Sequence, residues 1–207
     1  MTRDDERIQR SRQEPIVGGL PDAPGITAAM QLTPGLGVHL RGLADELLLH
    51  EYPGATLRRH EREMLATGVS AGNDCFFCMD SHAAFAAALL DRSGESQAAP
   101  LLDDLKLGAD SRFDPKMRAL LRIADIVRRS PLDLAAADVE AARAAGASDG
   151  DVQLAVLIAS AFSMYNRLVD GFRAMTPPST EAYRDSAERI AEHGYSTRPA
   201  PAGPGPG

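Results

Sequence analysis

Residues 56–92 read TLRRHEREMLATGVSAGNDCFFCMDSHAAFAAALLDR, and this segment predicts two helices joined by a short turn. The first expected helix begins near Thr56, a favourable N-cap, and ends at about Ala71, where a Gly-Asn pair follows. The second opens at Asp74, another favourable N-cap, and continues to about Arg92. Alanine and leucine dominate the composition of the whole chain while β-branched residues are scattered, which favours helices over strands. The segment therefore predicts a helical hairpin.

Helical periodicity recurs on both sides of this hairpin. Residues 151–172 are apolar almost all round, which is typical of a fully buried central helix or of one shared with a subunit interface. We predict an all-α, single-domain helical bundle of about seven to eight helices over residues 36–194. Besides the hairpin, the expected helices are 38–52, 97–107, 116–130, 135–146, 149–172 and 180–194.

The two ends of the chain differ from this bundle in composition. Residues 1–35 are rich in charge, proline and glycine, which predicts an extended N-terminal arm lying over the domain or a partner subunit. Residues 195–207 read YSTRPAPAGPGPG, which predicts a disordered Pro/Gly-rich tail. The N-terminus lacks the apolar core of a signal peptide, and no window approaches 18 uninterrupted apolar residues. We therefore expect a soluble, cytoplasmic protein with no membrane partner.

Charge and cysteine usage narrow the classes of function. The formal net charge of -7 offers no basic surface for a phosphate backbone, so nucleic acid is not an expected partner. The chain has two cysteines, Cys75 and Cys78, in a C-x-x-C pair. A bridge within one helical turn constrains almost none of the unfolded chain, so it would add little stability. Such a pair in a cytosolic protein indicates redox or metal chemistry.

A histidine and a glutamate accompany the cysteine pair. His82 follows Cys78 by four residues, and at 100° per residue Cys75, Cys78 and His82 share one narrow, inward-facing arc of the second helix. Glu63, on the first helix, lies off that helix's apolar stripe, so a solvated surface carboxylate is the simpler interpretation. The residues beside it are small, however, so another helix could approach closely and bury it.

These residue types support thiol chemistry. A thiolate is the nucleophile that attacks peroxides and disulfides, and the first turn of a helix favours an anion. The macrodipole favours Cys75 as the reactive thiol, while proximity to His82 favours Cys78, so helix geometry leaves the choice open. Glu63 could orient the imidazole or relay its proton. The chemistry permitted is oxidation of one thiol to a sulfenic acid, followed by a Cys75–Cys78 disulfide.

The motif resembles that of a known family. The pattern E-x11-C-x-x-C-x3-H, with VSA before the cysteines, is similar to the alkylhydroperoxidase D-like (AhpD-like), peroxidase-related branch of the carboxymuconolactone decarboxylase family. The resemblance extends more loosely over about 39–172 and includes the later segment LIASAFSMYNRLVDGF. It implies an AhpD-like helical bundle, a homo-oligomer (dimer, trimer or hexamer) and a thiol-dependent hydroperoxide reductase.

The resemblance also implies roles for single residues. Cys78 would be the peroxide-reactive thiol, Cys75 the resolving thiol, and Glu63 and His82 a proton relay acting on Cys78. It implies no bound cofactor and no bound metal, with an external dithiol or a lipoyl-carrier protein as reductant. Phe77 occupies the position before the second cysteine, where the best understood member of the family has a histidine.

Three alternatives share these residues. A decarboxylase-like lyase or isomerase would use His82 as its acid or base, although the decarboxylase branch generally lacks the C-x-x-C pair. A metal site would take Cys75, Cys78 and His82 with Glu63 or His60 as ligands. Zinc sites, however, more often combine two pairs of closely spaced ligands from separate segments, and this chain has one such pair. A redox-sensing or stress-response protein would form the same disulfide with little turnover.

Overall fold

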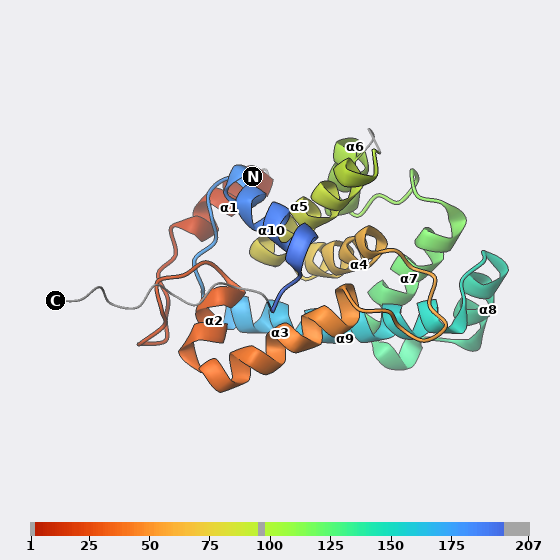
Figure 1. Cartoon of the computed structure of the whole chain (residues 1–207), viewed down its shortest axis with the longest axis horizontal. Helices are drawn as coiled ribbons and strands as arrows, with labels where there is room; N and C mark the ends of the chain where they lie inside the picture. The colour runs from red at the N-terminus through yellow and green to blue at the C-terminus, as the bar shows by residue number, and fades with distance from the viewer. Residues whose placement is uncertain (1–2, 95–97, 197–207) are drawn as a thin grey trace.

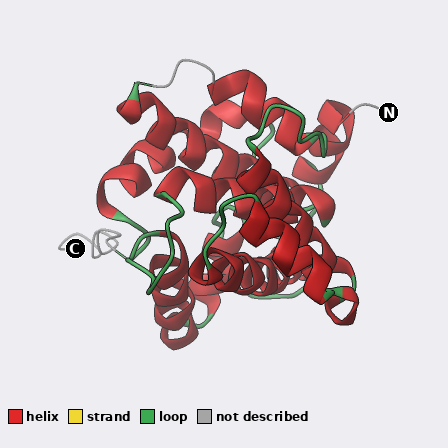
Figure 2. Ribbon diagram, turned by 90° about the vertical axis from the view of Figure 1, so that its right-hand side faces the viewer, coloured by secondary structure: helices red, strands yellow, loops and turns green. Residues whose placement is uncertain are grey.

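The structure, a computed structural model, describes residues 3–94 and 98–196 and is helical throughout (Figures 1 and 2). Within these ranges there is no β-strand, which confirms the all-α prediction. The described residues form ten α-helices and two short 3₁₀ helices; eight of the ten correspond to the seven to eight expected over 36–194, and the other two lie within residues 1–35. The elements are α1 (Arg3–Ser11), α2 (Ile26–Leu32), α3 (Pro34–Leu48), α4 (Arg59–Gly72), α5 (Phe76–Ser93), α6 (Ala98–Lys106), α7 (Pro115–Arg129), η1 (Pro131–Asp133), α8 (Ala136–Ala144), α9 (Asp149–Gly171), η2 (Thr180–Tyr183) and α10 (Arg184–His193).

Helix α9 forms the centre of the bundle and runs along α3, α4 and α7 (Figure 1). Its residues Leu154, Ile158 and Phe162 are almost completely buried, and they pack in one core with α4 and α7. By length and composition α9 could cross a membrane, but a buried core helix passes the same test. The other face of α9 exposes Leu157 (41%) and Met164 (39%), so the helix is central but not fully buried.

The N-terminal part of α9 is fixed by a buried carboxylate. Asp151, fully buried, accepts hydrogen bonds from the backbone N–H groups of Thr56 (2.7 Å) and Leu57 (2.9 Å) and from the Thr56 hydroxyl (2.8 Å). The Lys116 ammonium lies 3.0 Å from the same carboxylate. Burial by itself would raise the pKa of Asp151, but these hydrogen bonds and that of Ser148 outweigh it and hold the pKa well below its usual range.

Replacing Asp151 by asparagine should lower the free energy of unfolding by about 2–4 kcal/mol at pH 7, because buried N–H donors lose a charged acceptor. A carboxylate whose pKa is depressed by folding stabilises the protein above the unfolded-state pKa of about 3.9. The difference between the two proteins should therefore be full near pH 7 and shrink below about pH 4. Urea denaturation across this range measures it. Asp149→Asn, an exposed change in the same helical turn, should cost less than about 0.5 kcal/mol, and an equal cost would contradict the assignment.

The N-terminal region packs into the domain instead of forming the extended arm that its composition predicts. On α1, the Arg7 guanidinium donates to the buried carboxylate of Asp80 on α5 through Nε at 2.6 Å and Nη2 at 3.3 Å. On α2, Ala28 is fully buried and Met30 belongs to the main core. The Arg7–Asp80 ion pair and the packing of α2 in the core both join segments far apart in the sequence. Local proline and glycine content does not predict such contacts.

Candidate active site

The turn between α4 and α5 places the two cysteines. Asp74 adopts the left-handed conformation (φ 55°), which aspartate tolerates better than most residues. The Cys75 N–H then bonds back to the Ser70 carbonyl at 3.0 Å, and Cys75 takes the N-cap position of α5. The predicted helix start at Asp74 is thus one residue early. Cys75 precedes the first helical residue, while Cys78 lies within the first turn.

The two cysteines are free thiols with different surroundings. Both are buried, at 0% exposure for Cys75 and 2% for Cys78. A hydrogen bond with Cys78, burial, and the nearby charges of Cys78 and Asp170 raise the pKa of Cys75 well above its usual value. Cys75 therefore stays a protonated thiol at neutral pH and interacts with the sulfur of its neighbour.

Glu63 and His82 form a buried pair between α4 and α5. Glu63 is completely buried, and its Oε2 lies 2.6 Å from Nδ1 of His82. The interpretation of Glu63 as a surface carboxylate is therefore wrong, and the alternative of burial beside small residues holds. The His82 ring is held edge-on against Phe162, with ring centroids 4.6 Å apart, and against Phe85 at 5.1 Å. With Nδ1–H donated to the carboxylate, Nε2 is the ring nitrogen left to exchange a proton.

A tyrosine from the C-terminal segment completes this group. The Tyr195 hydroxyl donates to Oε1 of Glu63 at 2.6 Å and lies 3.4 Å from Nδ1 of His82. Burial, followed by the charge and hydrogen bond of Glu63, raises the pKa of Tyr195 well above its usual value, so the phenol remains a neutral donor. Each oxygen of the Glu63 carboxylate thus has one donor, and the pair becomes a Tyr195–Glu63–His82 triad.

Asp45 on α3 holds this segment in place. Its buried carboxylate accepts the backbone N–H groups of Tyr195 at 2.7 Å and Ser196 at 3.0 Å, and also the Ser196 hydroxyl. Residues 195–207 were predicted to be a disordered tail, but Tyr195 and Ser196 are anchored parts of the site. The remainder of that predicted tail, 197–207, lies outside the described residues.

Tyr195→Phe should lower the free energy of unfolding by about 1–3 kcal/mol, because it leaves Oε1 of the buried Glu63 carboxylate without its donor. Chemical denaturation measures this cost. Tyr52→Phe is the matched control, since its hydroxyl bonds to Gln153 at 3.2 Å in an exposed position and should cost little. Equal costs for the two variants would show that the Tyr195 hydroxyl bond adds nothing.

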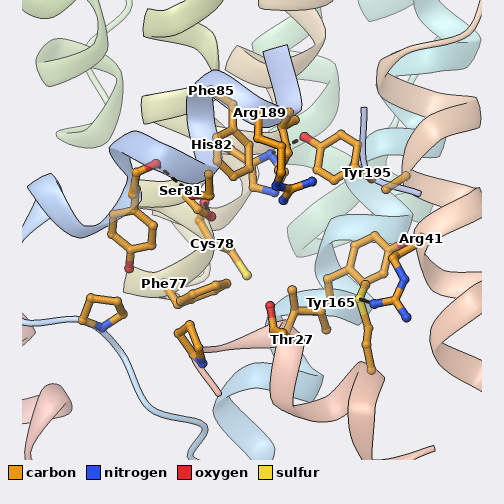
Figure 3. A pocket seen from close by; sticks show the side chains of 18 of the residues that line it. Thr27, Arg41, Phe77, Cys78, Ser81, His82, Phe85, Tyr165, Arg189 and Tyr195 are labelled. Atoms are coloured by element: carbon orange, nitrogen blue, oxygen red, sulfur yellow. Dashed lines mark hydrogen bonds between the residues drawn. The ribbon is translucent and has the colours of Figure 1, made fainter. Parts of the chain in front are cut away.

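A cavity of about 440 Å³ opens onto these side chains (Figure 3). Cys78 and His82 line it, whereas Cys75 does not. In Figure 3 the Cys78 sulfur points into the open space. The walls come from α2, α3, α5, α9, η2 and α10, so both ends of the chain enclose the site. The labelled lining residues are Thr27, Arg41, Phe77, Cys78, Ser81, His82, Phe85, Tyr165, Arg189 and Tyr195.

Phe77, the residue before the second cysteine, lines the cavity and also packs against Tyr183. Its ring meets Tyr183 edge-on at 5.7 Å between centroids. A Cβ atom at Gly25, whose φ is 51°, would lie 2.2 Å from the Phe77 ring. Only glycine therefore lets the loop before α2 approach the active-site helix this closely.

Two polar residues of α9 have structural roles. Asn166 accepts a hydrogen bond from Asn73 at 2.8 Å and donates to Ser70 at 3.0 Å, so its buried amide is satisfied. Tyr165 lines the cavity, and its hydroxyl donates to the Leu40 carbonyl at 2.7 Å. Among the described residues, no three His, Cys, Asp or Glu side chains lie together in a metal-binding arrangement. The metal-site alternative thus gains no support from the geometry.

The sequence prediction missed Tyr195, Asp45 and Arg41. Tyr195 had one weak signal, as an aromatic residue directly after a helix-ending glycine and before a Pro/Gly run. Asp45 and Arg41 carried none, because charged residues on an amphipathic helix are expected in solvent.

Comparison with known proteins shows which family this part of the chain is similar to. Residues 42–125 match the model of the carboxymuconolactone decarboxylase family. This segment contains Glu63, Cys75, Cys78 and His82. The match confirms the resemblance to this family that the motif predicts.

Two solved structures share the fold. One is titled as the alkylhydroperoxidase AhpD core of an uncharacterized peroxidase-related protein from Ralstonia eutropha JMP134, with a TM-score of 0.66, 23% identity, and 78% of this chain and 80% of that chain covered. The other is an uncharacterized peroxidase-related protein from Silicibacter sp. TM1040, with a TM-score of 0.67, 24% identity, and coverages of 83% and 95%. The fold is therefore AhpD-like. No match was found among curated proteins.

Proposed function

We propose that this protein is a thiol-dependent hydroperoxide reductase. The observation that carries the proposal is the arrangement around one cavity: Cys78 and His82 line it, and the buried Glu63 carboxylate holds His82 at 2.6 Å. A nucleophile, a base and a group that orients the base are the parts that thiol catalysis requires. The family and the peroxidase-related names of the two structural neighbours support the same class of reaction.

In the proposed reaction the Cys78 thiolate attacks the terminal oxygen of a hydroperoxide. The O–O bond breaks, the sulfur becomes a sulfenic acid, and the leaving alkoxide takes a proton to become an alcohol. His82 first accepts the Cys78 proton through Nε2 and then supplies the proton for the leaving group, while Glu63 stabilises the imidazolium. Glu63 and His82 thus act as the proton relay.

Cys75 then resolves the sulfenic acid. Its thiol gives up a proton, its sulfur bonds to that of Cys78, and the hydroxyl leaves as water. An external dithiol, either a small molecule or a lipoyl group on a carrier protein, reduces the disulfide and completes the cycle. Because Cys75 is fully buried and Cys78 lines the cavity, the reductant should attack the Cys78 sulfur. The cycle needs no bound cofactor or metal.

We also propose that the protein functions as a homo-oligomer. The helices α3 and α9 expose large apolar side chains, including Val38 (64%), Leu36 (49%) and Leu157 (41%). Apolar surface of this kind is typical of contacts between subunits.

The test is peroxide consumption together with thiol mapping. One equivalent of cumene hydroperoxide should convert the folded, reduced protein into a form lacking two hydrogens, with Cys75 and Cys78 joined in one peptide by mass spectrometry. With excess dithiothreitol the protein should turn over peroxide continuously. Stoichiometric oxidation with very slow turnover would favour the redox sensor instead, and unchanged thiols would contradict both functions.

A further inference from the structure

We propose that the cavity binds hydroperoxides of apolar carboxylic acids, with the carboxylate held by Arg41 and the hydrocarbon lying along the cavity wall. This inference rests on the proposed function and specifies its substrate class. It depends on the position of Arg41, on the other charges of the lining, and on the apolar character of the remaining wall.

Arg41 presents a cation to the cavity without a matching anion. It is a partly buried residue of α3 that lines the cavity, and its described contact runs from Nη1 to the Met30 sulfur at 3.5 Å (Figure 3). A thioether is a neutral, weak acceptor, so it satisfies little of a guanidinium with five N–H donors. The fork of donors that arginine presents matches a carboxylate in two parallel hydrogen bonds.

Other arginines of this protein show what the usual partners are. Many described ones lie within 4.0 Å of a carboxylate, including Arg7, Arg10, Arg112, Arg122, Arg128 and Arg143. Arg59 and Arg62 donate to backbone carbonyl oxygens. Arg41 has neither kind of contact among the described residues, although it lies beside a cavity large enough for a ligand.

The charges of the lining favour an anionic ligand. The cavity is lined by two arginines, Arg41 and Arg189, and by one acidic residue, Asp185. Asp185 and Arg189 lie four residues apart on α10, so their charges largely offset each other at that wall. Arg41, on α3, then leaves the lining with a net positive charge. An anion entering the cavity therefore gains more than a neutral molecule of the same shape.

The remainder of the cavity lining favours a ligand with a hydrocarbon chain. The lining also includes the apolar side chains of Ile26, Met30 and Phe162. Its volume of about 440 Å³ lies within the range of ligand pockets, roughly 300–1,000 Å³. A hydrocarbon chain would gain from leaving water here, while its carboxylate pairs with Arg41 and its hydroperoxide group reaches the Cys78 sulfur.

Binding can be tested apart from catalysis with octanoate and octanamide, which match in length but differ in charge. Isothermal titration calorimetry on the reduced full chain should show octanoate binding at least about tenfold more tightly than octanamide. Arg41→Gln should abolish this preference by weakening octanoate alone, and Arg41→Lys should retain part of it. Arg118→Gln, the same charge change at an exposed position of α7, should alter neither affinity.

Turnover with dithiothreitol then compares a fatty acid hydroperoxide with its methyl ester. We expect kcat/KM to favour the acid about tenfold in the parent, and Arg41→Gln to lose this preference while still reducing the ester. Equal affinity for octanoate and octanamide, or an acid preference unchanged in a folded Arg41→Gln protein, would overturn the inference. Octanoate binding that depends on Arg41, in a protein that consumes no peroxide, would instead support the binding site and reject the proposed function.

Discussion

Cys78→Ser is expected to abolish peroxide consumption, with a loss of at least about a thousandfold in kcat/KM. A serine hydroxyl at this position keeps the cavity shape but cannot be oxidised by a hydroperoxide, and no other thiol lines the cavity. Cys75→Ser should behave differently, because it keeps the reactive sulfur and loses only the residue that resolves the sulfenic acid. It should consume one equivalent of peroxide and then stop.

The two variants separate the roles of the thiols. A dimedone adduct on Cys78 should accumulate in Cys75→Ser after one equivalent of peroxide, and no adduct should form on Cys75 in Cys78→Ser. The reverse pattern would assign the reactive role to Cys75, in conflict with its raised pKa and its absence from the cavity wall. Full activity in the double variant would reject thiol chemistry and leave the lyase alternative, which needs only His82.

Local periodicity was sufficient for the second helix of the site. Cys78 and His82 lie one turn apart on α5, so the sequence predicts their shared inward face, and both are buried; Cys75, at the N-cap, is buried as well. Glu63 could not be treated in this way, because its burial depends on how α4 packs against α5. A helix wheel describes one helix and leaves its partner undefined, so it put this carboxylate in solvent.

The N-terminal and C-terminal segments also have positions that depend on packing partners far away in the sequence. Proline and glycine content predicted an arm and a tail, yet α1 is tied to α5 by Asp80, and Tyr195 is tied to α3 by Asp45. Both anchoring aspartates are buried residues on helices whose partners lie far away in sequence. Amino-acid composition describes a segment as an average over its residues. One buried carboxylate with well-placed hydrogen-bond donors is nevertheless enough to hold the whole segment against the bundle.

The division of the site between segments bears on how specificity arises. The proposed chemical residues lie within 42–125, the segment that matches the family. Arg41, the α9 wall and Tyr195 lie outside it and line the same cavity. A protein of this family can therefore keep the thiol chemistry while changing the walls that select the substrate.

Glu63→Gln is expected to slow the oxidation of Cys78 by about a hundredfold. Glutamine nearly preserves the shape of the buried side chain and can still accept a hydrogen bond, but it carries no charge. The imidazolium that forms when His82 takes the Cys78 proton would then lie against a neutral amide at the position of the 2.6 Å contact. Stopped-flow measurement of sulfenic acid formation in a Cys75→Ser background isolates this step from resolution and reduction.

A structural role alone would give a different result. If Glu63 only supports the packing of α4 on α5, Glu63→Gln should lower the melting temperature and leave the pH profile of Cys78 oxidation unchanged in the folded protein. If Glu63 stabilises the charged form of His82, the profile should change shape, while Glu140→Gln, an exposed change of the same kind on α8, should leave rate and profile unaltered. A rate within twofold of the parent would remove Glu63 from the relay. Any change at a fully buried carboxylate would lower the stability of the protein. The pH profile of Cys78 oxidation is therefore the measurement that tests the relay.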